Sequence, residues 1–272
     1  MAETRRIASS DGVNIAVRVE GHGHALYVLH GGPMNDKGSF GDYLRPLADD
    51  YEVCFIDQRG CGESDDAPPE TYTIPRLAED IEDVRLAMGH GRVIVLGHSF
   101  GGILAVQYAI QHPAGAAAVV LVDALFRGWR GVMATPSSWL LWLKALRPGK
   151  GDSAGLEFHL RYEVANREKV DEIRAMWNRP IRYDEARAGP LMKQGAGSFD
   201  INKVIASSIP VVGIYGAQDR RFLGDARALQ RAGAPVKFIP NAGHEPFVEQ
   251  PELFHAALRD LLSGALAEGA HA

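Results

Sequence analysis

Cysteine is scarce in this sequence, which limits the kinds of fold and chemistry that the chain can use. Its 272 residues include only two cysteines, Cys54 and Cys61. They form no Cys-x-x-Cys motif and no pair of histidines lies near them, so they indicate neither a disulfide framework nor a metal site. We expect two reduced thiols and no bound metal ion.

Basic residues and long apolar runs are scarce as well. Lysine and arginine number 29 against 34 aspartates and glutamates, and no basic run of the kind that follows nucleic-acid phosphates is present. The most apolar local stretch, residues 139–143, is far too short to span a bilayer, and residues 1–10 lack the apolar core of a signal peptide. We therefore expect a soluble, cytoplasmic protein without a nucleic-acid or membrane partner, while the oligomeric state is not indicated.

What the sequence does contain is an alternation of short apolar runs with stretches of helical periodicity. The expected strands are residues 4–8, 13–19, 25–29, 52–56, 93–96, 116–122, 210–215 and 236–239, and the expected core helices include 74–88, 102–112 and 224–232. Such alternation is typical of an α/β fold with a mostly parallel sheet flanked by helices.

The alternation lapses over residues 124–199, where glycines and prolines separate pieces of helical character. We expect an inserted helical lid over 124–199 and a core formed by residues 1–123 and 200–272. Within the lid, residues 137–146 are apolar almost all round and include Trp139 and Trp142. These two indoles predict a partly apolar substrate group.

One chemically distinctive motif follows the apolar run Val93 to Leu96. Residues 97–101 read Gly-His-Ser-Phe-Gly, a match to G-x-S-x-G, and a helical segment comes next. Glycines allow a sharp turn between a strand and a helix, which would hold the hydroxyl of Ser99 away from the sheet. Ser99 is therefore the candidate nucleophile, since backbone N–H groups at a helix N-terminus favour a developing oxyanion.

A second glycine-rich turn, His30-Gly-Gly-Pro33, ends the run 25–29. Glycine lets a backbone N–H approach a substrate oxygen without a side chain in the way. We expect the oxyanion donors to be the N–H groups of Phe100 and Gly32, with Gly31 as the close alternative.

Serine needs a base that takes its proton, and the base needs an acid that orients it. His244 and Asp219 each follow an expected strand, and the order Ser99, Asp219, His244 fits these roles. Asp123 competes with Asp219 as the acid because it also ends a strand. The charged segment 57–64 is expected to be a scaffold, in which Asp57 and Arg59 fix neighbouring backbone.

Together, His30-Gly-Gly-Pro33, Asp57-Gln-Arg-Gly-Cys-Gly-Glu-Ser64, Gly97-His-Ser-Phe-Gly-Gly102, Asp219 and Gly243-His244 resemble the α/β-hydrolase superfamily, and within it the prolyl aminopeptidase (proline iminopeptidase) branch. The resemblance implies Ser99, Asp219 and His244 as a catalytic triad beneath a cap. It also implies cap carboxylates that bind a substrate's free amino group. We expect a helix over 155–168 that is apolar on two faces, and the glutamates on its flanks, Glu157 and Glu163, are the candidates; simple solvation is the alternative role for each.

The expected activity is acyl transfer through an acyl-enzyme, without a metal or organic cofactor, on a small molecule or short peptide with an N-terminal proline or other small residue. Three features depart from the branch: Met34 follows the His-Gly-Gly-Pro turn, His98 precedes the serine, and the lid looks short. They leave open a carboxylesterase or lactonase acting on a small, partly apolar substrate. A member of the fold that binds a ligand without hydrolysing it is a further alternative.

Overall fold

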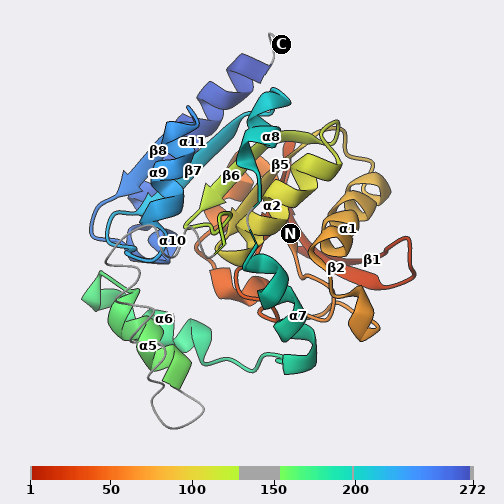
Figure 1. Ribbon diagram of the computed structural model, residues 1–272, viewed down its shortest axis with the longest axis horizontal. Coiled ribbons are helices and arrows are strands. Elements are labelled where there is room, and N and C mark those ends of the chain that lie inside the picture. Colours follow the sequence, from red (N-terminus) through yellow and green to blue (C-terminus); the bar gives the residue numbers. More distant parts are fainter. Residues whose placement is uncertain (1, 129–153, 198, 270–272) are drawn as a thin grey trace.

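The computed structural model describes residues 2–128, 154–197 and 199–269, and an eight-stranded sheet forms its centre (Figure 1). The strands are β1 (Glu3–Ala8), β2 (Asn14–Gly21), β3 (His24–Leu29), β4 (Tyr51–Ile56), β5 (Val93–His98), β6 (Ala116–Val122), β7 (Val211–Gly216) and β8 (Val236–Ile239). Their order across the sheet is β1-β2-β4-β3-β5-β6-β7-β8. β2 pairs antiparallel with β1 and β4, and the remaining neighbours run parallel. The expected α/β class is confirmed.

Helices cover both faces of this sheet. They are α1 (Ile74–Ala87), α2 (Phe100–Gln111), α5 (Ala154–Tyr162), α6 (Val170–Trp177), α7 (Glu185–Gly195), α8 (Ile201–Ala206), α9 (Leu223–Arg231), α10 (Pro246–Glu249) and α11 (Pro251–Gly269). Because successive strand residues point to opposite faces, Tyr27 packs with α1 and α2 while its neighbour Leu26 packs in the cluster that includes α11. None of the described helices is long and apolar enough to cross a membrane.

The turn between β5 and α2 is built from close backbone approaches. Ser99 has φ 52° and ψ −116°, a left-handed conformation that costs a non-glycine residue energy. A Cβ atom on Gly97 would lie 2.3 Å from the carbonyl oxygen of Gly101, and one on Gly101 would lie 2.3 Å from that of Leu29. The flanking glycines are therefore required for the strained serine, as the motif predicts.

Between β6 and β7 the chain leaves the sheet, and the described part of this segment is helical (Figure 1). α5 and α6 pack on each other to one side of the sheet, whereas α7 lies against α1. The boundaries 124–199 of the predicted lid stay a prediction. Trp139 and Trp142 lie outside the described residues.

The expected helix over 155–168 is wrong in its second half, since α5 ends at Tyr162. The N–H groups of Ala165 and Asn166 donate to Glu249 Oε2 at 2.7 and 2.8 Å instead of continuing the helix. This docking on α10 outweighs the helical periodicity of the sequence.

The loop after β4 is fixed by buried charges, as the sequence predicts. Asp57 Oδ1 accepts the N–H of Lys37 at 2.8 Å, and its Oδ2 accepts that of Glu63 at 2.9 Å. The side chain of Arg59 is fully buried; its Nε and Nη2 lie 2.7 and 2.6 Å from the two oxygens of Asp80, and Nη1 lies 2.9 Å from Asp11. Arg59 thereby joins this loop to α1 and to the β1–β2 turn.

Replacing Arg59 should therefore destabilise the fold strongly. Arg59→Met keeps most of the side-chain volume but leaves the buried carboxylate of Asp80 short of a partner, which should cost about 3 kcal/mol of unfolding free energy. Urea denaturation measures it. The control is Arg259→Met, which breaks a 2.6 Å pair with Asp50 at the surface and should cost under about 1 kcal/mol. Equal losses in both variants would contradict a structural role for the buried pair.

Candidate active site

The three residues predicted for acyl transfer gather at the carboxyl edge of the sheet. Ser99 follows β5, Asp219 follows β7 and His244 follows β8. His244 Nδ1 lies 2.8 Å from Asp219 Oδ2, and both side chains are buried. Because Nδ1 is engaged by the carboxylate, Nε2 is the ring atom that remains for a proton from Ser99.

The loop that carries His244 is clamped by the segment after α5. The N–H of His244 donates to the carbonyl of Glu163 at 2.8 Å, and a Cβ atom on Gly243 would lie 1.9 Å from that same oxygen. Phe222 stacks on the imidazole, with ring centroids 4.9 Å apart. Backbone and ring contacts together set the position of this histidine.

A small pocket surrounds Ser99, and we call it the Ser99 pocket. Its cavity volume is about 10 Å³, and it is lined by Gly31, Gly32, Asn35, Ser39, His98, Ser99, Trp177, His244 and Glu245. Ser99 and His244 thus face the same space. This volume is far below the ~300–1,000 Å³ of common ligand sites and corresponds to about one water molecule.

The expected oxyanion donors lie on either side of Ser99. Gly32 lines the Ser99 pocket and has φ 62°, and Phe100 is the first residue of α2. The first four N–H groups of a helix have no acceptor within it, which leaves that of Phe100 available. Their role as an oxyanion hole stays a prediction.

The structure does not bring the two lid carboxylates into the Ser99 pocket. The side chain of Glu157 is 55% exposed and pairs with Arg174. Glu163 is buried, but Oε1 lies 2.7 Å from Arg221 Nη1 and Oε2 lies 2.8 Å from His159 Nδ1. Arg221 and His159 therefore already bind the carboxylate of Glu163, which the sequence predicts as a partner of the substrate amine.

Two pocket residues were missed at the level of sequence, Glu245 and His98. Glu245 is fully buried, and both its oxygens lack a hydrogen bond to any described residue. The Gly-His-Glu sequence at 243–245 was the available signal, because the residue after His244 must share its loop. The sequence marks His98 only as a departure from the proline iminopeptidase branch.

Electrostatics around His244 favour its charged form. Burial alone would lower the pKa of His244, but Asp219, Glu245 and Glu163 together raise it above its usual value. A similar balance acts on His159, whose pKa burial would lower but which Glu245 and Glu163 raise to about 10. His98, by contrast, has its pKa lowered by burial to about 4 and is neutral.

Asp123, the competing acid, lies beside Asp219. Its carboxyl accepts the N–H of Gly216 at 3.0 Å, and one ligand atom each from Asp123, Asp219 and His244 fall within 4.8 Å of one another. Burial and then the Asp219 charge raise the pKa of Asp123 well above its usual value. Asp123 is therefore a neutral acid beside the Asp219–His244 pair. Among the described residues, Asp123, Asp219 and His244 also form a group whose ligand atoms could hold a metal ion.

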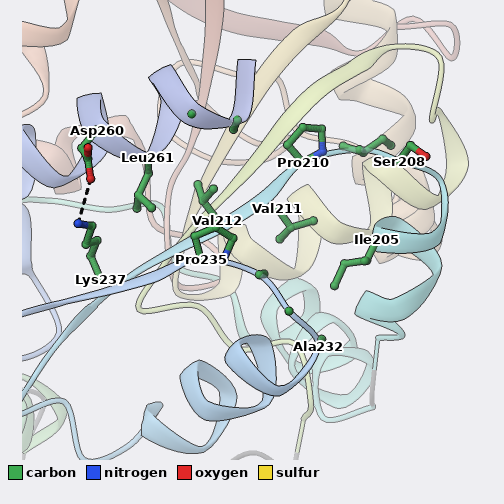
Figure 2. Close-up of a pocket in the computed structure, with 15 residues that line it drawn as sticks. Ile205, Ser208, Pro210, Val211, Val212, Ala232, Pro235, Lys237, Asp260 and Leu261 are labelled. Carbon is green, nitrogen blue, oxygen red and sulfur yellow. Dashed lines mark ion pairs between the residues drawn. The ribbon is translucent and has the colours of Figure 1, made fainter. Parts of the chain in front are cut away.

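A larger cavity lies at the opposite edge of the sheet (Figure 2). Its 560 Å³ is bordered by Val211 at the start of β7 and Pro235 ahead of β8. An ion pair of 2.9 Å joins Lys237 and Asp260 at its side. The described lining of this cavity contains none of the three residues predicted for acyl transfer, so the Ser99 pocket is the candidate active site.

Comparison with known proteins agrees with this geometry. The family described as the alpha/beta hydrolase fold matches residues 24–251. A proline iminopeptidase from Saccharolobus solfataricus is 44% identical over 111 residues, which are 37% of this chain and 34% of that protein. The aligned stretch is thus about a third of that relative's length.

Two further relatives match over nearly the whole chain. The proline iminopeptidase PfmaB from Pestalotiopsis fici is 37% identical over 279 aligned positions, covering 93% of this chain and 97% of that one. The crystal structure of an esterase from a Rhodococcus species has a TM-score of 0.75 at 23% identity and covers 96% of this chain and 99% of its own. At that identity the esterase supports the fold alone.

The raised pKa of Asp123 predicts a pH-dependent stability difference. An unfolded aspartate loses its proton near pH 3.9, whereas folded Asp123 keeps it, so rising pH favours the unfolded chain until the folded pKa is passed. Asp123→Asn cannot ionise and should gain stability relative to the wild type between pH 5 and 7. Urea denaturation at both pH values measures this gain.

The exposed Asp49, changed to asparagine, is the matched control for the Asp123 experiment. Its stability difference from the wild type should not move between the two pH values. A difference for Asp123→Asn that is equally independent of pH would mean that Asp123 is ionised in the folded protein.

Proposed function

The chain belongs to the α/β-hydrolase fold family, and on that premise we propose that it is a serine hydrolase that removes an N-terminal proline or other small residue from a short peptide or amide. Ser99 is the proposed nucleophile, His244 the general base and Asp219 the acid that orients it. The observation that carries the proposal is the strained Ser99, which opens into the same small pocket as a histidine held 2.8 Å from a buried carboxylate.

The proposed reaction has two halves. Ser99 Oγ attacks the substrate carbonyl carbon while His244 Nε2 takes its proton, and the N–H groups of Gly32 and Phe100 stabilise the oxyanion. His244 then protonates the leaving amine as the carbon–nitrogen bond breaks, leaving an acyl-enzyme. A water molecule that gives its proton to His244 attacks the ester, and Ser99 regains its proton as the acid product departs.

Support for an N-terminal residue as substrate comes from relatives and from size. PfmaB, whose name is proline iminopeptidase, aligns over most of both chains. The Ser99 pocket is narrow, about 10 Å³ as bounded by the described part of the chain, which disfavours a bulky group beside the nucleophile. The lid carboxylates speak for the second candidate, an ester or lactone, because Glu157 and Glu163 are both held by cations of the protein itself.

Steady-state hydrolysis separates these candidates. The wild type should cleave proline p-nitroanilide with a higher kcat/KM than p-nitrophenyl acetate or butyrate. Ser99→Ala removes the nucleophile and should lower every activity by about 10⁴-fold or more. A fluorophosphonate probe should label the wild type and leave Ser99→Ala unlabelled. Cleavage of esters alone would replace the peptide substrate by an ester or lactone, and folded wild type without labelling would rule out the serine hydrolase.

The pH profile tests the proposed base. His244 accepts a proton only when neutral, and its raised pKa means that activity should begin to fall already above pH 6.5 as the solution is acidified. The kcat/KM for p-nitrophenyl acetate between pH 5 and 9 reports the free enzyme. An inflection well below 6.5 would show that Asp219, Glu245 and Glu163 do not control this histidine.

A further inference from the structure

Glu245 is a buried charge inside the Ser99 pocket that the proposed reaction does not use. Burial alone would raise its pKa, but His159, His244 and His98 hold it below its usual value, so the carboxylate is ionised. His159 Nε2 lies 3.0 Å from Oε1, yet neither carboxylate oxygen has a well-aligned hydrogen bond from any described residue. A buried carboxylate that lacks well-aligned donors gains from donors that a ligand supplies.

A second unpartnered acceptor lies in the same pocket. His98 Nε2 is 2.9 Å from the carbonyl of His244, so this nitrogen carries the proton. The ring is neutral, and Nδ1 therefore presents a lone pair that accepts no hydrogen bond within the described residues. Nδ1 faces Gly31, where a Cβ atom would approach it to 2.9 Å. Two acceptors without donors thus border one cavity.

The described ionisable groups around this cavity carry more negative than positive charge. In the described part of the chain, Glu163 and Glu245 have ion pairs with His159 and Arg221, whereas Asp219 bonds to His244, which is neutral when it acts as the base. The carboxyl of Glu249 accepts backbone N–H groups, and burial raises its pKa to about 7. A ligand with one positive charge would balance the group.

We propose that Glu245 and His98 form the subsite for the protonated N-terminal amine of the substrate. A protonated amine brings two or three N–H donors and one positive charge, which matches the unpartnered acceptors and the missing cation. This inference rests on the proposed function and replaces Glu157 and Glu163 as the amine-binding groups.

The position of the subsite also fits the chemistry. In an N-terminal residue the nitrogen is two bonds from the scissile carbonyl carbon, a separation of about 2.5 Å. The amine must therefore sit in the same small cavity as the nucleophile. Glu245 meets this requirement because it follows His244 directly and lines the Ser99 pocket. Amine binding would also neutralise a charge that favours protonated His244, which would release the base for catalysis.

The decisive variant is Glu245→Gln, which preserves shape and removes charge. Its kcat/KM for proline p-nitroanilide should fall by about 100-fold, because the ammonium loses its buried partner. Its kcat/KM for p-nitrophenyl acetate, which has no amine, should change chiefly through a lower pH midpoint, because Glu245 also helps to raise the pKa of His244. The loss on the prolyl amide relative to the ester, compared on the plateau of each pH profile, therefore isolates the contact with the amine. The control is Glu70→Gln at an exposed position, which should leave both values unchanged. Equal losses on both substrates would overturn the subsite and assign Glu245 to the fold or to His244.

A binding measurement separates the subsite from the proposed peptide substrate. L-Prolinol keeps the ring and the amine but has no carbonyl group to cleave. It should inhibit ester hydrolysis competitively in the wild type, whereas N-acetyl-L-prolinol should not, and Glu245→Gln should raise its inhibition constant about 100-fold. Inhibition without prolyl cleavage would overturn the proposed peptide substrate and keep the cation subsite; absence of competition would overturn the subsite even if prolyl amides are cleaved.

A second variant keeps the test decisive if Glu245→Gln does not fold. Glu245→Asp retains the charge opposite His159 but withdraws it by one methylene group. It should lose about 10-fold on the prolyl amide and little on the ester, with an unchanged thermal midpoint. A prolyl activity equal to that of the wild type would contradict direct contact between Glu245 and the amine.

Discussion

The backbone contact between Glu163 and His244 is the constraint on which the site depends. It is a 2.8 Å hydrogen bond between the loop that carries His244 and the segment after α5. Only glycine at position 243 lets these two backbone segments approach each other so closely. Glu249 strengthens the junction, since one oxygen binds the N–H of Gly243 and the other binds those of residues 165 and 166. The segment after α5 therefore helps to place the imidazole of His244.

This junction also explains why charges accumulate in a buried place. Glu163 reaches the site because its backbone is docked there, and its carboxylate is held by His159 and Arg221. His159 in turn lies between Glu163 and Glu245, with the centroid of its imidazole 4.7 Å from that of the Trp177 ring. Buried ion pairs seldom stabilise a fold as well as apolar residues do. Their presence next to the candidate nucleophile indicates a role in recognising charge.

The strand ends of the site could be predicted from sequence, and its charge pairing could not. Ser99, Asp219 and His244 follow apolar runs, and parallel strands bring such ends to one edge whatever lies between. Glu157 and Glu163 were chosen by helical periodicity, which places a residue on a helix face and says nothing of cations brought from Arg174 or Arg221. Glu245 was overlooked because a carboxylate beside a histidine has no periodic signature. The early end of α5 depended on acceptors from α10, far along the chain.

From the sequence alone, both Asp123 and Asp219 could be the acid that orients His244. Asp123 and Asp219 end neighbouring strands, and the structure keeps both beside His244. Two carboxylates this close cannot both ionise cheaply, so one holds a proton. Asp219 bonds to His244 Nδ1, whereas Asp123 faces the N–H of Gly216 and is neutral. A neutral acid beside Asp219 adds no second negative charge next to the pair that Asp219 forms with His244. The different roles of Asp123 and Asp219 depend on which of the two carboxyl groups holds a proton. A pattern of residues in the sequence does not show this.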